Sequence, residues 1–154
     1  MSGNAPEIDL PQLPNARVAI ISSSWHLDIC NDLIAGAERA LAAAAIKNVE
    51  VIYVPGSFEI PLASQIAFEK GIDAVVAVGL VLEGETPHFD YVCQGVTQGV
   101  MDVSLKFSAP IGFGVLMCNT LDQAVARSGR PGSSEDKGYD SAVAAIKLLQ
   151  LKGG

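Results

Sequence analysis

The chain has 154 residues, of which 49% are hydrophobic and 18% are charged, and its formal net charge is -7 at pH 7. This length and composition are typical of one globular domain with its own hydrophobic core, and they exclude a disordered chain. The acidic balance, together with the lack of any basic cluster, argues against nucleic-acid binding, because a phosphate backbone has to be neutralised by cations.

Three cysteines, Cys30, Cys93 and Cys118, lie far apart in apolar segments. Their odd number and spacing indicate buried thiols in a reducing compartment. With only two histidines beside them, we expect no metal site. Residues 1–15 lack the basic start and apolar core of a signal peptide, and the longest apolar run is about half of what a membrane helix needs. We therefore expect a cytoplasmic protein that does not bind membranes.

The first fifteen residues are polar and contain three prolines, which predicts a flexible arm outside the core. Residues 16–154 are predicted to form a single domain. It opens with a strand over residues 17–22, the turn Ser-Ser-Trp-His, and a helix over about residues 27–45. Trp25 falls at the carboxyl end of this strand, where open α/β sheets bind ligands. The alternative is that Trp25 only covers the sheet edge, and His26 is interpreted as a surface residue.

A second predicted strand, residues 49–54, leads into the sequence PGSFEIP and then a helix over about residues 61–70. Two prolines and a glycine make the loop around Ser57, Phe58 and Glu59 stiff. A stiff loop that carries backbone amides and one carboxylate can hold a planar ligand without being ordered on binding. The alternative is a plain helix-capping turn in which the helix macrodipole favours Glu59.

The third predicted strand, residues 73–82, is apolar without alternation, which is typical of a strand buried on both faces. Thr86 is predicted to cap the next helix, and Pro87 to occupy its first position. Free backbone N–H groups at such a helix start attract anions, phosphate above all. His88 stands beside them, and an imidazole can transfer protons near neutral pH. The alternatives are that Thr86 and Pro87 merely start a helix, and that His88 is a surface or core residue.

The fourth predicted strand, residues 111–117, carries Phe113 and Gly114, and the glycine permits close approach of a ligand or another backbone. A short helix ending at Gly129, a loop over residues 130–136 and a helix over about residues 137–151 complete the chain. The alternation of strands and helices predicts an α/β fold. We expect a three-layer α/β/α sandwich around a four-stranded parallel sheet in the flavodoxin-like order 2-1-3-4. No G-x-x-x-x-G-K or G-x-S-x-G motif supports nucleotide hydrolysis or serine-hydrolase chemistry.

Six separated motifs together resemble the lumazine synthase family over residues 17–149. They are SSWH, PGSFEIP and GETPHFDYVC after the first three strands, FGVL in the fourth, QAVARSG in the short helix and DKG before the last helix. The resemblance implies condensation of 5-amino-6-ribitylaminouracil with 3,4-dihydroxy-2-butanone 4-phosphate. The products would be 6,7-dimethyl-8-ribityllumazine, phosphate and water, in the penultimate step of riboflavin biosynthesis, by a transferase that needs no cofactor and no metal.

The resemblance also implies roles for individual residues. His88 would be the catalytic proton shuttle. The pyrimidine and its ribityl chain would be held by Trp25, Ser57, Phe58, Glu59, Leu80, Val81, Leu82 and Phe113. The phosphate group would be bound by Glu85, Thr86, Arg127 and Lys137. Two residues depart from the family pattern, Glu83 where many members carry Arg or Lys and Met117 where Thr is frequent.

Members of this family build each active site between neighbouring subunits of a pentamer, so Phe113, Arg127 and Lys137 would cross that interface. The loop over residues 130–136 is longer than in members that form icosahedral shells, and the arm is proline-rich, which favours a homopentamer or a decamer of two pentamers. Two alternatives stay open. One is a non-catalytic flavodoxin-like module that holds a flavin phosphate on residues 22–24, and the other is a shell-forming homologue without activity.

Overall fold

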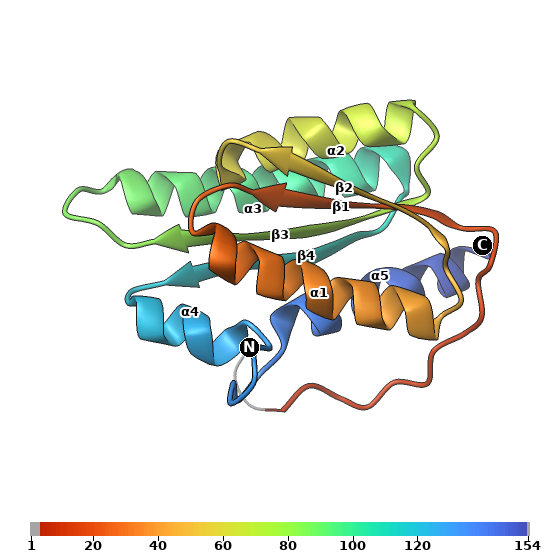
Figure 1. Ribbon diagram of the computed structural model, residues 1–154. Helices are drawn as coiled ribbons and strands as arrows, with labels where there is room; N and C mark the ends of the chain where they lie inside the picture. Colours follow the sequence, from red (N-terminus) through yellow and green to blue (C-terminus); the bar gives the residue numbers. More distant parts are fainter. Residues whose placement is uncertain (1–3, 154) are drawn as a thin grey trace.

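Four parallel strands form a single sheet in the computed structural model, which describes residues 4–153. The strands are β1 (Arg17–Ser23), β2 (Asn48–Val54), β3 (Ala74–Leu82) and β4 (Ile111–Cys118). Their order across the sheet is β2-β1-β3-β4 (Figure 1), which confirms the predicted topology. All neighbouring strands run parallel, so their carboxyl ends meet at one edge of the sheet.

Helices cover both faces of the sheet and complete the predicted three layers (Figure 1). The helical segments are α1 (Leu27–Ala43), the 3-10 helix η1 (Ser57–Glu59), α2 (Ile60–Glu69), α3 (His88–Phe107), α4 (Leu121–Arg127) and α5 (Lys137–Lys152). Helices α1, α4 and α5 lie on one face, and α2 and α3 lie on the other. Within the described residues, no helix combines the length and the apolar composition that crossing a membrane requires.

The two faces of the sheet carry two separate hydrophobic clusters, because successive side chains of a strand point to opposite sides. In β1, Val18 and Ile20 pack with α1 and α5, whereas Ala19 and Ile21 pack with α2 and α3. Residues 74–80 of β3 are all buried, which explains why this stretch is apolar without alternation. Burial on both faces fixes the position of β3 in the sheet. Its carboxyl end lies beside the loops that follow β1 and β2.

The start of α3 differs from the prediction by one position. The helix begins at His88, and Pro87 occupies the N-cap position, with no side-chain capping bond. The reason is that Pro87 already has helical dihedral angles, and its carbonyl accepts the first helical bond, from Asp90 N–H at 3.0 Å. The prediction that Thr86 caps the helix is therefore wrong, and this hydroxyl makes no hydrogen bond within residues 4–153.

Residues 10–13 of the N-terminal arm lie against the end of α1. The Leu13 N–H donates to the Ala44 carbonyl at 2.8 Å, and the Gln12 side chain donates to the Ala43 carbonyl at 3.0 Å. Leu10 and Leu13 also pack partly against the core on this side. The first residues of the predicted arm, 1–3, lie outside the described residues, and the flexibility of the arm stays a prediction.

Candidate active site

A cavity of about 800 Å³ opens at the carboxyl edge of the sheet. It is lined by Trp25 and His26 after β1, by residues 55–59 after β2, by residues 80–82 of β3, and by the first turns of α3 with the loop before it. These segments are far apart in the sequence, and they meet because parallel strands end at the same edge. The arrangement matches the ligand crevice that the sequence predicts there.

Trp25 offers a large aromatic surface to this cavity, since 68% of the residue is exposed. Its carbonyl accepts a hydrogen bond from the Cys30 thiol at 3.2 Å, which holds the turn between β1 and α1. His26 adopts a left-handed conformation, with φ of 55°, and also lines the cavity. The prediction that His26 is a surface residue is confirmed by its exposure. Its position at the wall of the cavity was not predicted.

The loop after β2 combines a capping turn with a binding surface. The Gly56 N–H donates to Glu59 Oε2 at 2.9 Å, so Glu59 closes the turn before α2. Ser57 is only 4% exposed, and its hydroxyl has no hydrogen-bond partner within residues 4–153. Phe58 is 59% exposed at the cavity wall. A buried hydroxyl without a partner costs stability, so Ser57 is suited to receive a hydrogen bond from a ligand.

The last residues of β3 present unpaired backbone groups to the cavity. Pairing with β1 ends at Ser22 and Val78, whereas pairing with β4 continues as far as Leu82 and Cys118. Beyond Val78 the β1 side of β3 therefore lacks a partner strand, apart from the Leu80 N–H, which lies 3.4 Å from the Ser23 hydroxyl. Free carbonyl and N–H groups along residues 80–82 can bind the hydrogen-bonding edge of a planar ring.

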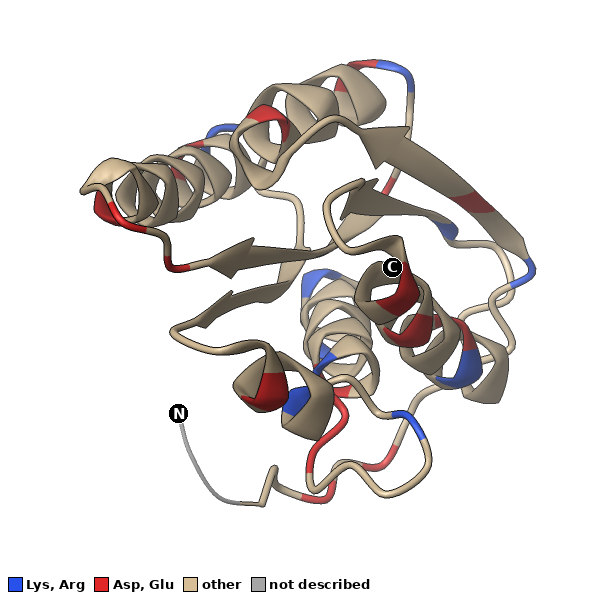
Figure 2. Cartoon of the chain, turned by 60° about the vertical axis from the view of Figure 1, so that its left-hand side comes forward, with Lys and Arg blue, Asp and Glu red and all other residues tan. Residues whose placement is uncertain are grey.

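His88 is exposed at the first position of α3 and lines the cavity together with Thr86. Glu83 and Glu85 are exposed and do not line it, although acidic residues cluster in the loop before α3 (Figure 2). No lysine or arginine is among the described residues that line the cavity. A phosphate bound there would therefore meet the backbone N–H groups at the start of α3, but no lysine or arginine of residues 4–153.

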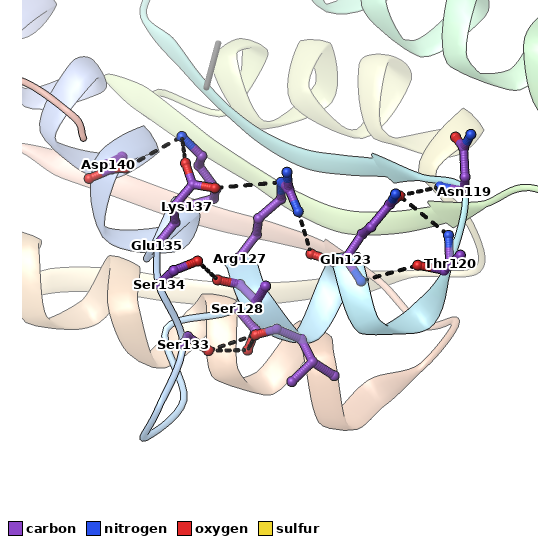
Figure 3. Close-up of polar contacts among 12 residues, drawn as sticks. Asn119, Thr120, Gln123, Arg127, Ser128, Ser133, Ser134, Glu135, Lys137 and Asp140 are labelled. Atoms are coloured by element: carbon purple, nitrogen blue, oxygen red, sulfur yellow. Dashed lines mark hydrogen bonds and ion pairs between the residues drawn. The ribbon is translucent and has the colours of Figure 1, made fainter. Parts of the chain in front are cut away.

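Phe113, Arg127 and Lys137 lie outside this cavity. Phe113 projects from the edge strand β4 and is 41% exposed. Arg127 ends α4 and Lys137 begins α5, and both form ion pairs with Glu135 (Figure 3). The structure of one chain thus brings together Trp25, residues 57–59, residues 80–82, Thr86 and His88. It leaves Glu85, Phe113, Arg127 and Lys137 outside the cavity.

Other candidate chemistries find little support in the described residues. Ser22 and Ser23 are fully buried, and the Ser24 hydroxyl donates to the Val54 carbonyl at 2.8 Å, so residues 22–24 do not form the alternative phosphate site. Burial raises the pKa of the Cys118 thiol, and burial together with the charge of Asp90 raises that of Cys93. These thiols stay protonated near neutral pH and are poor nucleophiles.

Comparison with known proteins gives consistent matches over nearly the whole chain. The family model described as 6,7-dimethyl-8-ribityllumazine synthase matches residues 15–153. A protein of that name from Streptomyces coelicolor is 49% identical over 147 residues, covering 95% of this chain and 91% of its own. Another from Kocuria rhizophila is 49% identical over 156 residues, covering 99% of both chains. A third, from a Mycobacterium species, is 46% identical over 156 residues.

Proposed function

Since the chain belongs to the 6,7-dimethyl-8-ribityllumazine synthase family, we propose that the cavity at the carboxyl edge of the sheet is its active site. The enzyme is a transferase of riboflavin biosynthesis. It condenses 5-amino-6-ribitylaminouracil with 3,4-dihydroxy-2-butanone 4-phosphate and releases 6,7-dimethyl-8-ribityllumazine, phosphate and water.

The observation that carries this placement is the meeting of an aromatic surface, an unpaired strand end and an imidazole in one cavity. Trp25 stacks on the pyrimidine ring, and the backbone of residues 80–82 binds its polar edge. Residues 57–59 hold the ring and the ribityl chain, and the Ser57 hydroxyl gains the partner that it lacks without substrate. The pyrimidine substrate is therefore fixed by groups of a single chain.

The phosphate of the second substrate binds at the start of α3, at the backbone of Glu85 and the free hydroxyl of Thr86. Because no lysine or arginine of the described residues lines the cavity, a dianion needs cations from elsewhere. We assign this role to Arg127 and Lys137 of a neighbouring subunit, with Phe113 closing the pocket. This assignment requires an oligomer, a homopentamer or two pentamers paired into a decamer.

The chemistry consists of proton transfers around two condensations. The 5-amino group attacks the ketone and forms an imine with loss of one water, and phosphate is then eliminated. The ribitylamine nitrogen attacks the remaining carbonyl and closes the second ring with loss of a second water. Holding both reactants in register can supply about 7–11 kcal/mol of the barrier reduction. His88, beside the reacting nitrogen atoms, moves the protons and adds about 10²–10⁴-fold.

A direct assay tests the proposed site and its subunit composition. The two substrates are mixed with the protein, and lumazine formation is followed by absorbance and fluorescence. His88→Ala and Arg127→Ala chains are then assayed separately and after co-expression in mixed oligomers. If the site lies between subunits, about one quarter of the interfaces in an equal mixture combine intact His88 with intact Arg127, and activity returns. Mixed oligomers without recovered activity would contradict the shared site.

The surroundings of the site support two further proposals. Residues 16–154 act as one catalytic domain, with the preceding residues as a flexible arm. The free thiols of Cys30, Cys93 and Cys118 suit a reducing compartment, so we place the enzyme in the cytoplasm. Activity after deletion of residues 1–9, which hold no helix or strand within the described part, would support the first of these proposals.

A further inference from the structure

Glu135 lies between the two cationic residues that are assigned to the phosphate (Figure 3). Its Oε1 is 3.0 Å from Lys137 Nζ, and its Oε2 is 3.6 Å from Arg127 Nε. The carboxylate side chain is only 15% exposed. One largely buried carboxylate thus joins a residue at the end of α4 to a residue at the start of α5.

The backbone of Glu135 is fixed to the end of α4. Its N–H donates to the Ala126 carbonyl at 3.0 Å, and its carbonyl accepts from the Gly129 N–H at 3.1 Å. The Ser133 hydroxyl also donates to the Val125 carbonyl at 2.6 Å, which holds the intervening loop against the same helix. The backbone position of Glu135 is therefore set by α4, independently of the two cations that its carboxylate contacts.

The Arg127 guanidinium is held from two sides. Its Nη1 donates to the Gln123 carbonyl at 2.9 Å, while its Nε faces Glu135. Within residues 4–153 its Nη2 has no partner, so this nitrogen is available to an anion. Lys137 has a second, weaker contact with Asp140, at 3.8 Å. Both cations are oriented before any ligand binds, and each keeps N–H groups for a ligand.

We propose that Glu135 is a positioning residue that holds Arg127 and Lys137 side by side to receive the substrate phosphate. This inference rests on the proposed function, in which these two residues bind that phosphate in a neighbouring subunit's site. Two adjacent cations repel each other, and long side chains lose rotamer freedom when they bind an anion. The Glu135 carboxylate reduces both costs, because it offsets the repulsion and orders the side chains in advance.

A competing role would give the opposite result. If Glu135 mainly occupied the cations as a substitute anion, its removal would strengthen phosphate binding. The Glu135→Gln variant separates the two roles, because glutamine keeps the shape and an acceptor oxygen but loses the charge. Under the positioning role, the KM for the phosphorylated substrate rises about tenfold, since Lys137 and Arg127 lose the negative charge with which they form ion pairs.

The experiment measures both KM values, kcat and the inhibition constant of inorganic phosphate for the whole oligomeric enzyme. We expect Glu135→Gln to raise the KM for the phosphorylated substrate and the phosphate inhibition constant together, with the KM for the pyrimidine unchanged. Glu135→Asp, which keeps the charge, recovers part of the loss. Glu38→Gln removes a charge at an exposed position of α1, and it serves as the control with both KM values unchanged.

Three outcomes would overturn the inference. They are an unchanged KM for the phosphorylated substrate in Glu135→Gln, a lower one, and a parallel rise of both KM values, which indicates general structural damage. Arg127→Gln and Lys137→Gln are measured alongside. If these two variants bind the phosphorylated substrate normally, the proposed phosphate site itself fails. If they bind it weakly while Glu135→Gln does not, only the role of Glu135 is wrong.

Discussion

The ring of Phe58 lies over the backbone of Gly95 in α3, so closely that a methyl group on Gly95 would come within 2.5 Å of the ring atom Cε1. No side chain fits between them. Gly95 thus sets the position of an exposed aromatic ring that forms part of the cavity wall. Substitution at a half-buried helix position that does not line the cavity can therefore reshape the proposed pyrimidine site.

We predict that Gly95→Ala weakens pyrimidine binding without destabilising the fold. Alanine favours a helix interior over glycine by about 0.8–1.0 kcal/mol, whereas the exposed Phe58 ring can rotate away at little cost to the core. The KM for the pyrimidine substrate should rise severalfold, while the free energy of unfolding is unchanged or higher. Steady-state kinetics and urea denaturation measure the two effects.

A double-mutant cycle checks that the effect of Gly95→Ala passes through Phe58. In a Phe58→Ala background the added methyl group has no ring to displace, so Gly95→Ala should cause no further loss. Gln94→Ala, at an exposed position of the same helix turn, is the control for helix propensity. Equal losses in both backgrounds would show that Gly95 acts by another route.

His88→Gln should slow the reaction by about 10²–10⁴-fold without abolishing it, because substrate positioning persists when proton transfer is lost. His26 supplies an internal comparison, since it is the second histidine of the chain and lines the same cavity. His26→Asn keeps a residue type that tolerates the left-handed conformation and should reduce the rate far less. Single-turnover rates of both variants would identify the imidazole that moves the protons; equal rates would remove His88 from that role.

Most of the fold and one wall of the site follow from local sequence patterns. The buried strand before Leu82, the turn that carries Trp25 and the proline-bounded loop around Phe58 all occur where predicted. Their meeting in space also follows, because parallel strands finish at a common edge. Helix α3 begins at His88, one residue after the predicted start at Pro87. N-cap preferences cannot tell which of two adjacent residues begins the helix.

The remaining features depend on contacts between distant segments and leave no local signal. The link from Glu135 to Arg127 and Lys137 exists because a loop folds back on α4, and no periodicity predicts that return. The same holds for the place of His26 at the cavity, which depends on an unusual backbone conformation. The functional importance of Gly95 likewise appears only when the ring packed on it is known.

Asp140→Asn should make the enzyme more stable near neutral pH. Burial raises the pKa of the Asp140 carboxyl above its ordinary value of 3.8, with Asp136 and Glu135 acting in the same direction against Lys137. The folded state thus binds this proton more tightly than the unfolded state, so stability falls as pH rises through the raised pKa. The asparagine variant has no carboxyl group at this position, so its stability does not fall in this way as pH rises. Urea denaturation at several pH values should show its advantage at neutral pH and little difference in acid; the exposed Glu38→Gln is the control.

Gly138 places Lys137 at the start of α5 and packs this helix on α1. A methyl group on Gly138 would overlap the backbone carbonyl of Leu33, which cannot rotate away as a side chain does. Gly138→Ala must therefore separate the two helices, at a cost of about 1–3 kcal/mol. The displacement also moves Lys137, so the KM for the phosphorylated substrate should rise.

Thermal unfolding of Gly138→Ala at a fixed protein concentration measures the first effect, since the stability of an oligomer depends on concentration. The melting temperature should fall by several degrees. Gly84→Ala is the matched control for stability, because a methyl group there meets no atom within 4 Å. The prediction fails if Gly138→Ala has the melting temperature of the wild type and the same KM for the phosphorylated substrate. In that case the close contact between α1 and α5 does not position Lys137, and the two phosphate-binding cations depend on Glu135 and the loop after α4 alone.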